Sequence, residues 1–168
     1  SYSKKSFNNK YGVPISLFNI NKEDKIGIFE VGMDKKGEID FLTKKIMPNI
    51  GVITNISYAH IKNFKNLWGV AQAKSEIINN IAKDGYIILN ADDNFFSFFK
   101  SKSIKKKLKI VTFGVKKKSD VSLINIKKEK SLSVIYINFN RKKLKFIVKK
   151  NLENYIYNIL STLAVISI

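Results

Sequence analysis

The chain has 168 residues, 45% of them hydrophobic, so it is long enough to build one folded domain with a buried core. It contains no cysteine, which excludes disulfides and thiolate metal sites. No apolar run approaches the length that crosses a bilayer, and the N-terminal residues lack the pattern of a signal peptide, so we expect a cytoplasmic protein.

The formal net charge of +18 raises nucleic acid as a partner. The charge is uneven, because residues 100–150 hold 18 of the 31 Lys and Arg side chains and only Asp120 and Glu129 as acids. Arg is nearly absent, although its planar guanidinium is the group that grips phosphate in two places. A coding bias toward Lys, Asn and Ile explains the same composition. We therefore favour a solvated basic surface and keep nucleic-acid binding through this segment as the alternative.

The first part of the chain predicts a loop and then a strand. Residues 8–14 read as a loop, in which Gly12 is free to adopt a positive φ. Residues 15–20 fit a short helix or an extended segment equally well. The run 25–31 is short, apolar and bounded by polar turns, which is typical of a buried strand.

Further along, apolar spacing predicts alternating helices and strands. Ile39, Leu42 and Ile46 share one helical face, and later segments show either the same spacing or short apolar runs. The expected elements are a helix over 38–45, a strand over 49–56, a helix over 67–81, and strands over 86–89 and 109–113. Alternation of this kind implies a parallel sheet with crossover helices.

From about residue 120 the pattern changes to short segments of period two, joined by polar turns. Residues 121–126, 133–139 and 143–148 are expected to form three antiparallel strands, and residues 153–168 an apolar helix. The predicted fold class is therefore α/β, with a mostly parallel sheet flanked by helices and a small antiparallel sheet near the C-terminal part.

Candidate functional residues lie where these strands are expected to end, which is where sites on parallel sheets form. A carboxylate such as Glu30 at a strand end is a ligand for Mg²⁺ beside a phosphate loop, and a solvated acid is its plainer role. His60 is the only histidine, and a packed or surface histidine is the plainer role. Lys74, on the predicted helix, reads first as a solvent-facing lysine. Asn90 and the acids after it read as a turn whose side chains cap backbone amides.

No Gly-x-x-x-x-Gly-Lys-Ser/Thr phosphate loop occurs in these residues. Five segments nevertheless stand in one order: Asn-Asn-Lys-Tyr-Gly-Val-Pro (8–14), Glu-Val-Gly-Met-Asp-Lys-Lys-Gly-Glu-Ile (30–39), Thr-Asn-Ile-Ser-Tyr-Ala-His (54–60), Ala-Gln-Ala-Lys-Ser-Glu-Ile (71–77) and Leu-Asn-Ala-Asp-Asp (89–93). Together they resemble the central ATPase domain of the Mur ligases, over nearly the whole chain. The first two segments are most similar to the family member that adds D-alanyl-D-alanine to UDP-N-acetylmuramoyl-tripeptide in peptidoglycan synthesis.

The resemblance implies an ATP-dependent amide-bond ligase that works through an acyl phosphate, with ATP and Mg²⁺ as cofactors. It assigns Mg²⁺ to Glu30 and His60, and to Lys74 once that lysine is carbamylated; Lys74 and His60 are also the implied catalytic residues. Asn8 and Asn9 are placed near the substrate and phosphate end. The implied partners are UDP-N-acetylmuramoyl-tripeptide and D-alanyl-D-alanine, and a monomer without membrane contact is expected.

Two departures qualify the resemblance. The family's phosphate loop, expected just before Asn8, and the flanking domains are missing, so residues 1–168 are expected to form a partial central domain that is inactive alone. The family also carries Gly-x-His-Asn-x-x-Asn at the start of the last helix, with the asparagines contacting adenine. Here residues 152–158 read Leu-Glu-Asn-Tyr-Ile-Tyr-Asn, and only Asn158 matches. An inactive copy, and a sister ligase of the folylpolyglutamate or cyanophycin synthetase type, remain the alternatives.

Overall fold

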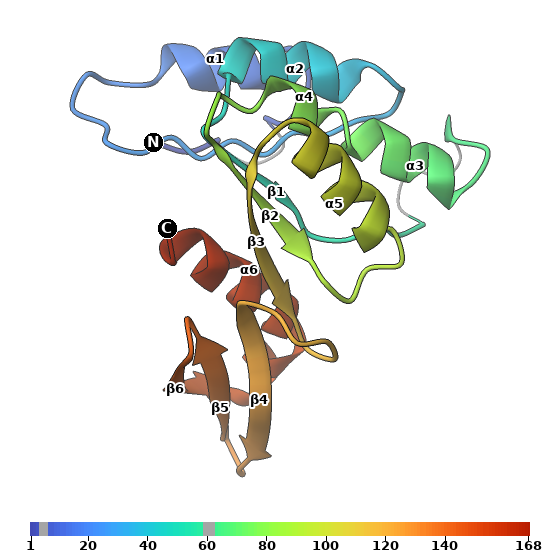
Figure 1. Ribbon diagram of the computed structural model, residues 1–168. Coiled ribbons are helices and arrows are strands. Elements are labelled where there is room, and N and C mark those ends of the chain that lie inside the picture. Colours follow the sequence, from blue (N-terminus) through green and yellow to red (C-terminus); the bar gives the residue numbers. More distant parts are fainter. Residues whose placement is uncertain (4–6, 59–62) are drawn as a thin grey trace. The chain divides into compact units, whose positions relative to one another are not determined.

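The computed structural model describes residues 1–3, 7–58 and 63–168, and the chain falls into two compact units (Figure 1). The helical unit consists of Ser1–Asn49 and Ser57–Ala82, and the sheet unit consists of Ile50–Ile56 and Lys83–Ile168. No helix in the described part of the chain is long and apolar enough to span a bilayer.

Four short helices make up the helical unit, and α2 contacts the other three. Their bounds are Gly12–Phe18 for α1, Glu38–Ile46 for α2, Leu67–Lys74 for α3 and Ile77–Asn80 for α4. The predicted helix at 38–45 is confirmed as α2, which buries Ile39 and Leu42 as the spacing indicates. It ends at Ile46 because Met47 adopts a left-handed conformation with φ 47°.

The loop predicted for residues 8–14 is wrong in its second half, because α1 begins at Gly12. The segment 15–20, for which helix and extended chain were equally favoured, is helical as far as Phe18. Gly12 does not have a positive φ. It is buried instead, and a Cβ there would lie 2.3 Å from the Cα of Phe7. Glycine is therefore required because two backbone segments pass too closely for any side chain.

The strand predicted over 25–31 is also wrong. Within the described residues it makes only an isolated parallel bridge between Ile28 and Tyr2. Ile26 is 69% exposed and Ile28 66% exposed, so the run is not buried. A strand needs a ladder of several residue pairs, and within the described residues the backbone hydrogen bonds of this run reach only Ser1 and Ser3. Apolar composition alone did not supply a partner.

The helix predicted over 67–81 is interrupted. It divides into α3 and α4 at Ser75 and Glu76, although the apolar spacing continues across the break. The Oγ of Ser75 donates to the backbone carbonyl of Gln72 at 2.6 Å, which closes the last turn of α3. Lys74 is therefore the final residue of a helix rather than a residue in the middle of one.

The sheet unit contains one six-stranded sheet in the order β1-β2-β3-β4-β5-β6. Neighbours from β1 to β4 pair in parallel, and β4, β5 and β6 pair antiparallel, which confirms the predicted fold class. The antiparallel strands continue the parallel sheet rather than forming a second one. The strands are Ile50–Ile53, Tyr86–Asn90, Lys109–Gly114, Val121–Lys128, Leu132–Phe139 and Lys142–Lys149.

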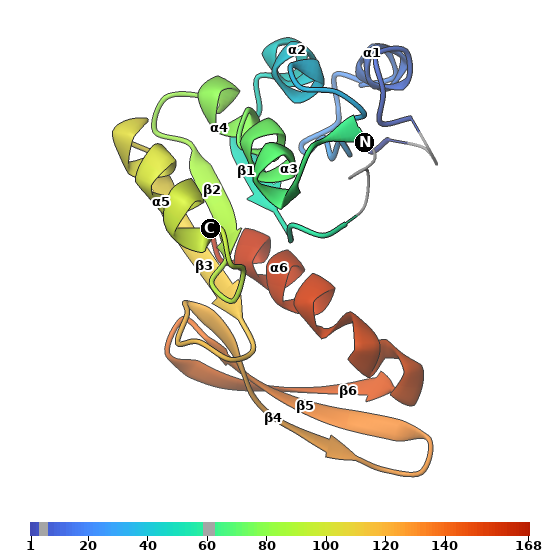
Figure 2. The same ribbon diagram turned by 90° about the vertical axis from the view of Figure 1, so that its right-hand side faces the viewer.

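Two helices pack against β2 and β3 in this unit, α5 (Phe96–Lys105) and α6 (Ile156–Ile166), and Figure 2 shows them on opposite sides of those strands. A 3₁₀ turn, η2 (Lys150–Tyr155), precedes α6, so the predicted last helix begins later than expected. No element was predicted for the segment that forms α5. Its phenylalanines crowd one end and its lysines the other, which hides the helical period.

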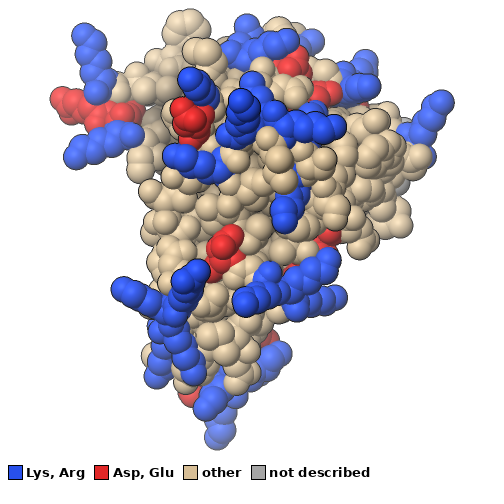
Figure 3. All heavy atoms as spheres, in the orientation of Figure 1, with Lys and Arg blue, Asp and Glu red and all other residues tan. Residues whose placement is uncertain are grey.

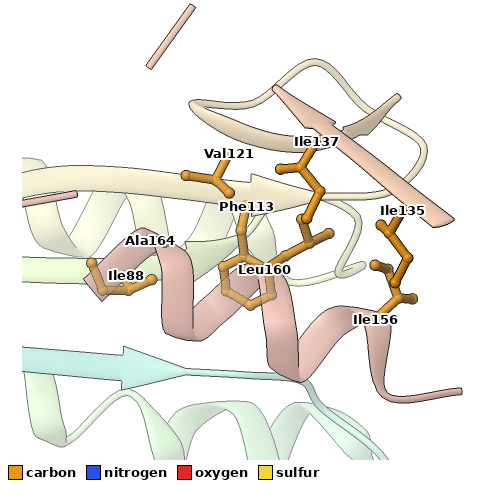
Figure 4. Packing of buried hydrophobic residues seen from close by; sticks show 8 residues of the cluster. All are labelled: Ile88, Phe113, Val121, Ile135, Ile137, Ile156, Leu160 and Ala164. Carbon is orange, nitrogen blue, oxygen red and sulfur yellow. The ribbon is translucent and has the colours of Figure 1, made fainter. Parts of the chain in front are cut away.

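The core of the sheet unit lies under α6 (Figure 4). Ile156, Leu160 and Ala164 follow one another at a spacing of four residues, so they share one face of the helix. They meet side chains from β2 to β5, namely Ile88, Phe113, Val121, Ile135 and Ile137. Because β5 contributes two of these, the antiparallel strands and the parallel strands share one hydrophobic core.

Candidate functional site

The first candidate group is the pair formed by Asn8 and Glu30 in the helical unit. The Nδ2 of Asn8 donates to Oε1 of Glu30 at 3.0 Å. The backbone N–H of Gly32 donates to the carbonyl of Asn8 at 2.7 Å, so the chain just after Glu30 folds back against Asn8. Glu30 remains exposed. Two residues that the sequence placed at one site are therefore in direct contact, although Glu30 follows no strand.

Asn9 is engaged in holding α1. Its Oδ1 accepts hydrogen bonds from the backbone N–H groups of Tyr11 and Gly12, both at 3.0 Å. These are orphan donors at the start of the helix, and an asparagine oxygen commonly satisfies them. Because an amide oxygen can only accept, the Asn9 side chain can donate to an anion only through its Nδ2.

Lys74 and His60 complete the residues that the sequence assigns to metal binding. Lys74 ends α3, and its side chain is partly buried. His60 lies outside the described residues, so its assignment stays a prediction. Among residues 1–3, 7–58 and 63–168, no three His, Cys, Asp or Glu side chains gather as a metal cluster.

The chemistry of the Asn8–Glu30 pair nevertheless fits Mg²⁺. This ion takes oxygen ligands, keeps several of its waters, and is commonly held by one or two carboxylates together with the phosphates of a nucleotide. Glu30 supplies an exposed carboxylate, and Asn8 donates a hydrogen bond to it. A complete set of protein ligands is not required for such a site.

Between Glu30 and α2 runs the loop 33–37, and two carboxylates hold it. Oε2 of Glu38 accepts from the backbone N–H groups of Asp34 at 2.6 Å and Lys35 at 2.9 Å. These two hydrogen bonds, of which the one from Asp34 has the larger effect, lower the pKa of Glu38 below its ordinary value. Burial acts in the opposite direction but is the weaker effect. The second carboxylate is Glu76, which is only 8% exposed. The loop is thus fixed at both ends by acids.

Glu76 reaches α2 from the turn after α3. Its Oε1 accepts from the backbone N–H of Gly37 at 2.8 Å, and its Oε2 accepts from that of Asp40 at 3.1 Å. Both donors lie at the N-terminus of α2, where a negative charge is stabilised by the helix dipole. The sequence analysis did not assign Glu76 a role, since nothing in the sequence brings residues 37 and 76 together.

In the sheet unit, the segment after β2 forms the predicted capping turn. Oδ1 of Asn90 accepts from the backbone N–H of Asp92 at 3.0 Å, and Oδ1 of Asp93 accepts from that of Phe95 at 2.8 Å. The Nδ2 of Asn90 also donates to the carbonyl of Thr54 at 3.0 Å, which joins the ends of β1 and β2. This plainer role for Asn90 is confirmed.

Asp92 binds the loop after β3. Its carboxylate accepts from the backbone N–H groups of residues 115–117 at 2.6 to 3.0 Å and from the hydroxyl of Tyr157 at 3.1 Å. Burial alone would raise the pKa of Asp92, but the three N–H donors and the hydroxyl lower it overall. Burial and the bond to Asp92 raise the pKa of Tyr157. Tyr157 lies in the first turn of α6, within the stretch that departs from the family motif, and no sequence pattern indicated this bond.

Asn158 is exposed near the start of α6, one residue after Tyr157. Its backbone carbonyl accepts from the hydroxyls of Ser161 and Thr162, both at 2.9 Å. The exposed amide is available for an adenine, as the motif match implies, and this assignment stays a prediction.

Comparison with known proteins decides the family. Residues 2–166 match the Mur ligase middle domain. The chain belongs to the Mur ligase family. The UDP-N-acetylmuramoyl-tripeptide–D-alanyl-D-alanine ligase of Buchnera aphidicola subsp. Baizongia pistaciae is 42% identical to this Mur ligase domain over 103 residues, which are 61% of this chain and 22% of that protein. The ligase of the same name from Rickettsia prowazekii is 41% identical over 108 residues, which are 64% of this chain and 24% of that protein.

A solved structure agrees with these relatives. The fold of this Mur ligase domain matches a crystal structure of MurF from Acinetobacter baumannii with a TM-score of 0.85 and 25% identity, over 99% of this chain and 35% of that one. The chain spans about a quarter of the length of the two curated relatives. The resemblance seen in the five sequence segments is therefore confirmed at the level of the family and the fold.

Lysine and arginine side chains of this Mur ligase domain gather over β4, β5 and β6 (Figure 3). Two of them, Lys127 and Lys143, lie over the ring of Tyr136, with their Nζ atoms 5.8 Å and 4.8 Å from its centroid. Tyr136 therefore carries two ammonium groups, an arrangement that stabilises the cations on the ring face.

Proposed function

We propose that this chain is the central domain of an ATP-dependent ligase that joins D-alanyl-D-alanine to UDP-N-acetylmuramoyl-tripeptide. The observation that supports it most is the contact between Asn8 and Glu30, because it joins two of the motif segments at an exposed carboxylate. The relatives that are 41% and 42% identical carry this activity in their names. We propose further that residues 1–168 form only part of the catalytic unit and do not turn over alone.

In the proposed reaction, an oxygen of the tripeptide's terminal carboxylate attacks the γ-phosphorus of ATP, and ADP leaves, which gives an acyl phosphate. The amine of D-alanyl-D-alanine then attacks the acyl carbon. The tetrahedral intermediate loses inorganic phosphate, the amine loses its proton, and an amide remains. Both steps place extra negative charge on oxygens, so groups that stabilise this charge carry the catalysis.

Specific residues serve these steps. Glu30, together with His60 and a carbamylated Lys74, would hold Mg²⁺, and the ion when bound would neutralise charge on the phosphate oxygens. Asn8 holds the Glu30 carboxylate in place through Nδ2. Asn9 presents its Nδ2 toward the phosphate end, and Asn158 presents its amide to adenine. We propose also that the protein is a soluble, cytoplasmic monomer.

The test uses the full-length protein that contains this chain, with ATP and either D-alanyl-D-alanine plus the UDP-linked tripeptide or glutamate plus a folate. Phosphate release only with the first pair is the expected result. Release with the second pair alone would replace this proposal with a sister ligase, and no release with either would leave an inactive copy.

A matched pair of variants tests the site. Glu30→Gln keeps the size of the side chain but removes the charge, and we expect phosphate release to fall by about 100-fold. Glu23→Gln is the control, because Glu23 is an exposed acid of the same unit outside every motif segment. Equal rates for the two variants would show that Glu30 holds no cation.

A further inference from the structure

We propose that Glu76 is a positioning residue that fixes the loop following Glu30 to the end of the helix that carries Lys74. This inference rests on the proposed function, because the relation between Glu30 and Lys74 matters only if both serve one site. Its starting point is the pair of hydrogen bonds from the backbone N–H groups of Gly37 and Asp40 to the two oxygens of Glu76.

The first step is the position of Glu76 in the chain. It lies two residues after Lys74, in the break between α3 and α4. Contacts that fix Glu76 therefore also restrict the backbone at Lys74, because only one residue lies between them. That residue, Ser75, is itself buried and bonded to the carbonyl of Gln72. The end of α3 has little freedom to move away from α2.

The second step is the position of the donors. Gly37 ends the loop that begins after Glu30, and it adopts a φ of 92°, which favours glycine. This conformation turns its N–H toward Glu76 at the start of α2. At the other end of the loop, Gly32 is bonded to Asn8, and Asn8 is bonded to Glu30. Hydrogen bonds at the two ends of this loop, joined by its backbone, thus connect Asn8 and Glu30 to the segment of Lys74.

The third step is the cost of placing a carboxylate here. Glu76 is 8% exposed, and burying a charge is unfavourable unless donors compensate for it. Two N–H groups and the α2 dipole provide that compensation. An apolar side chain of similar size would leave the N–H groups of Gly37 and Asp40 without these acceptors. The carboxylate therefore holds the loop and the start of α2 in one fixed geometry relative to Glu76.

The chain offers a matched control at the same interface. Asn80, in α4, also binds α2, since its Nδ2 donates to Oδ1 of Asp40 and to Oγ1 of Thr43, both at 2.9 Å. It lies further along the chain from Lys74 and makes none of its bonds to the loop before α2. Asn80→Ala should weaken the packing of α4 on α2 without releasing that loop.

The experiment compares wild type, Glu76→Gln and Asn80→Ala in the full-length protein. Carbon-13 NMR after incubation with labelled bicarbonate reads the carbamate on Lys74, and phosphate release is measured as a function of Mg²⁺ concentration. We expect Glu76→Gln to lower the carbamate signal and to raise the Mg²⁺ concentration for half-maximal rate by about 10–100-fold. Asn80→Ala should stay within about twofold of wild type in both, even if thermal unfolding shows equal destabilisation.

Equal effects of Glu76→Gln and Asn80→Ala on carbamate and Mg²⁺ dependence would overturn the inference, because Glu76 would then be a purely structural contact. If Glu76→Gln does not fold, Glu76→Asp is measured instead, since it keeps the charge but shortens the reach. The absence of a carbamate on wild-type Lys74 would also overturn it. A wild-type carbamate without phosphate release would overturn the proposed function alone, and the carbamate in the variants would then decide the inference.

Discussion

The two units of this domain differ in the contacts that stabilise each of them internally. In the sheet unit, eight buried apolar side chains from four strands and α6 form one cluster, and backbone ladders join six strands. In the helical unit, apolar side chains such as Leu42 and Ile78 are also buried, but the short helices are fixed in addition by polar side chains that bind backbone N–H groups, among them Asn9, Glu38 and Glu76. Apolar packing tolerates many sequences that fill the same volume, whereas each polar bond needs one residue type. Two of the candidate metal residues, Glu30 and Lys74, lie in the helical unit.

The largest effect should come from the apolar cluster. Leu160→Ala removes a fully buried side chain beneath the sheet, and we expect it to lower the free energy of unfolding by about 2–5 kcal/mol. Leu152→Ala is the control, because Leu152 is 42% exposed and its loss should change stability little. Chemical denaturation followed by circular dichroism measures both. A small effect of Leu160→Ala would mean that α6 does not close this core.

A smaller and more local effect is expected in the helical unit. Asn9→Ala leaves the first N–H groups of α1 without their cap and should cost about 0.5–2 kcal/mol. Hydrogen exchange should speed up in α1 and remain unchanged in the sheet unit. Asn19→Ala, an exposed asparagine after the end of α1, should leave exchange unaltered. Faster exchange throughout the chain would contradict the separation of the two units.

The sheet unit also contains polar centres, and one of them, Asp92, should affect stability at acid pH. The folded pKa of Asp92 is lowered, so its stabilising contribution is full above the unfolded value of about 3.9 and is lost as pH falls through the folded value. Asp92→Asn removes this titration. We expect the stability difference between wild type and Asp92→Asn to shrink as pH falls below about 4, in melting curves taken from pH 7 to pH 2. A difference that stays constant over this range would show that the carboxylate charge is not what the three N–H groups bind.

The smallest effect is expected on the basic surface of β4, β5 and β6. Lys143→Ala removes one of two cations over Tyr136, and as an exposed substitution it should change the free energy of unfolding by less than about 0.5 kcal/mol. The double variant Lys127→Ala and Lys143→Ala should lose no more free energy of unfolding than the sum of the two single losses. Denaturant titration at low and high salt measures this, and a loss above 1 kcal/mol would make the ring contact a structural one.

Periodicity predicted what depends on local pattern. The helix with Ile39 and Leu42 on one face was confirmed, and so were the strands whose runs pair with neighbours in the sheet. It failed where a distant residue decides the outcome. The apolar spacing runs through Ser75, but a bond from Glu76 to another helix accompanies the break there. The apolar run at Ile28 has no ladder to join, so it stays exposed.

The site was predictable to a similar extent. Motif order brought Asn8 and Glu30 into one hypothesis, and the structure brings them into contact. Glu76 lies inside a quoted motif, and yet its partner at Gly37 is 39 residues away, a distance over which no pattern reaches. Tyr157 was noticed only as a departure from the family, whereas it donates to Asp92 across 65 residues.

The position of β6 at the edge of the sheet suggests a role for its lysines that needs no ligand. β6 is the last strand of the sheet, so one of its sides presents unpaired backbone groups that could add a strand from another copy of the chain. Its exposed positions include Lys143, Lys145 and Lys149. Two such edges brought together would place these like charges side by side, which opposes edge-to-edge aggregation. Replacing these lysines should change the free energy of unfolding little. It should lower the protein concentration at which self-association begins.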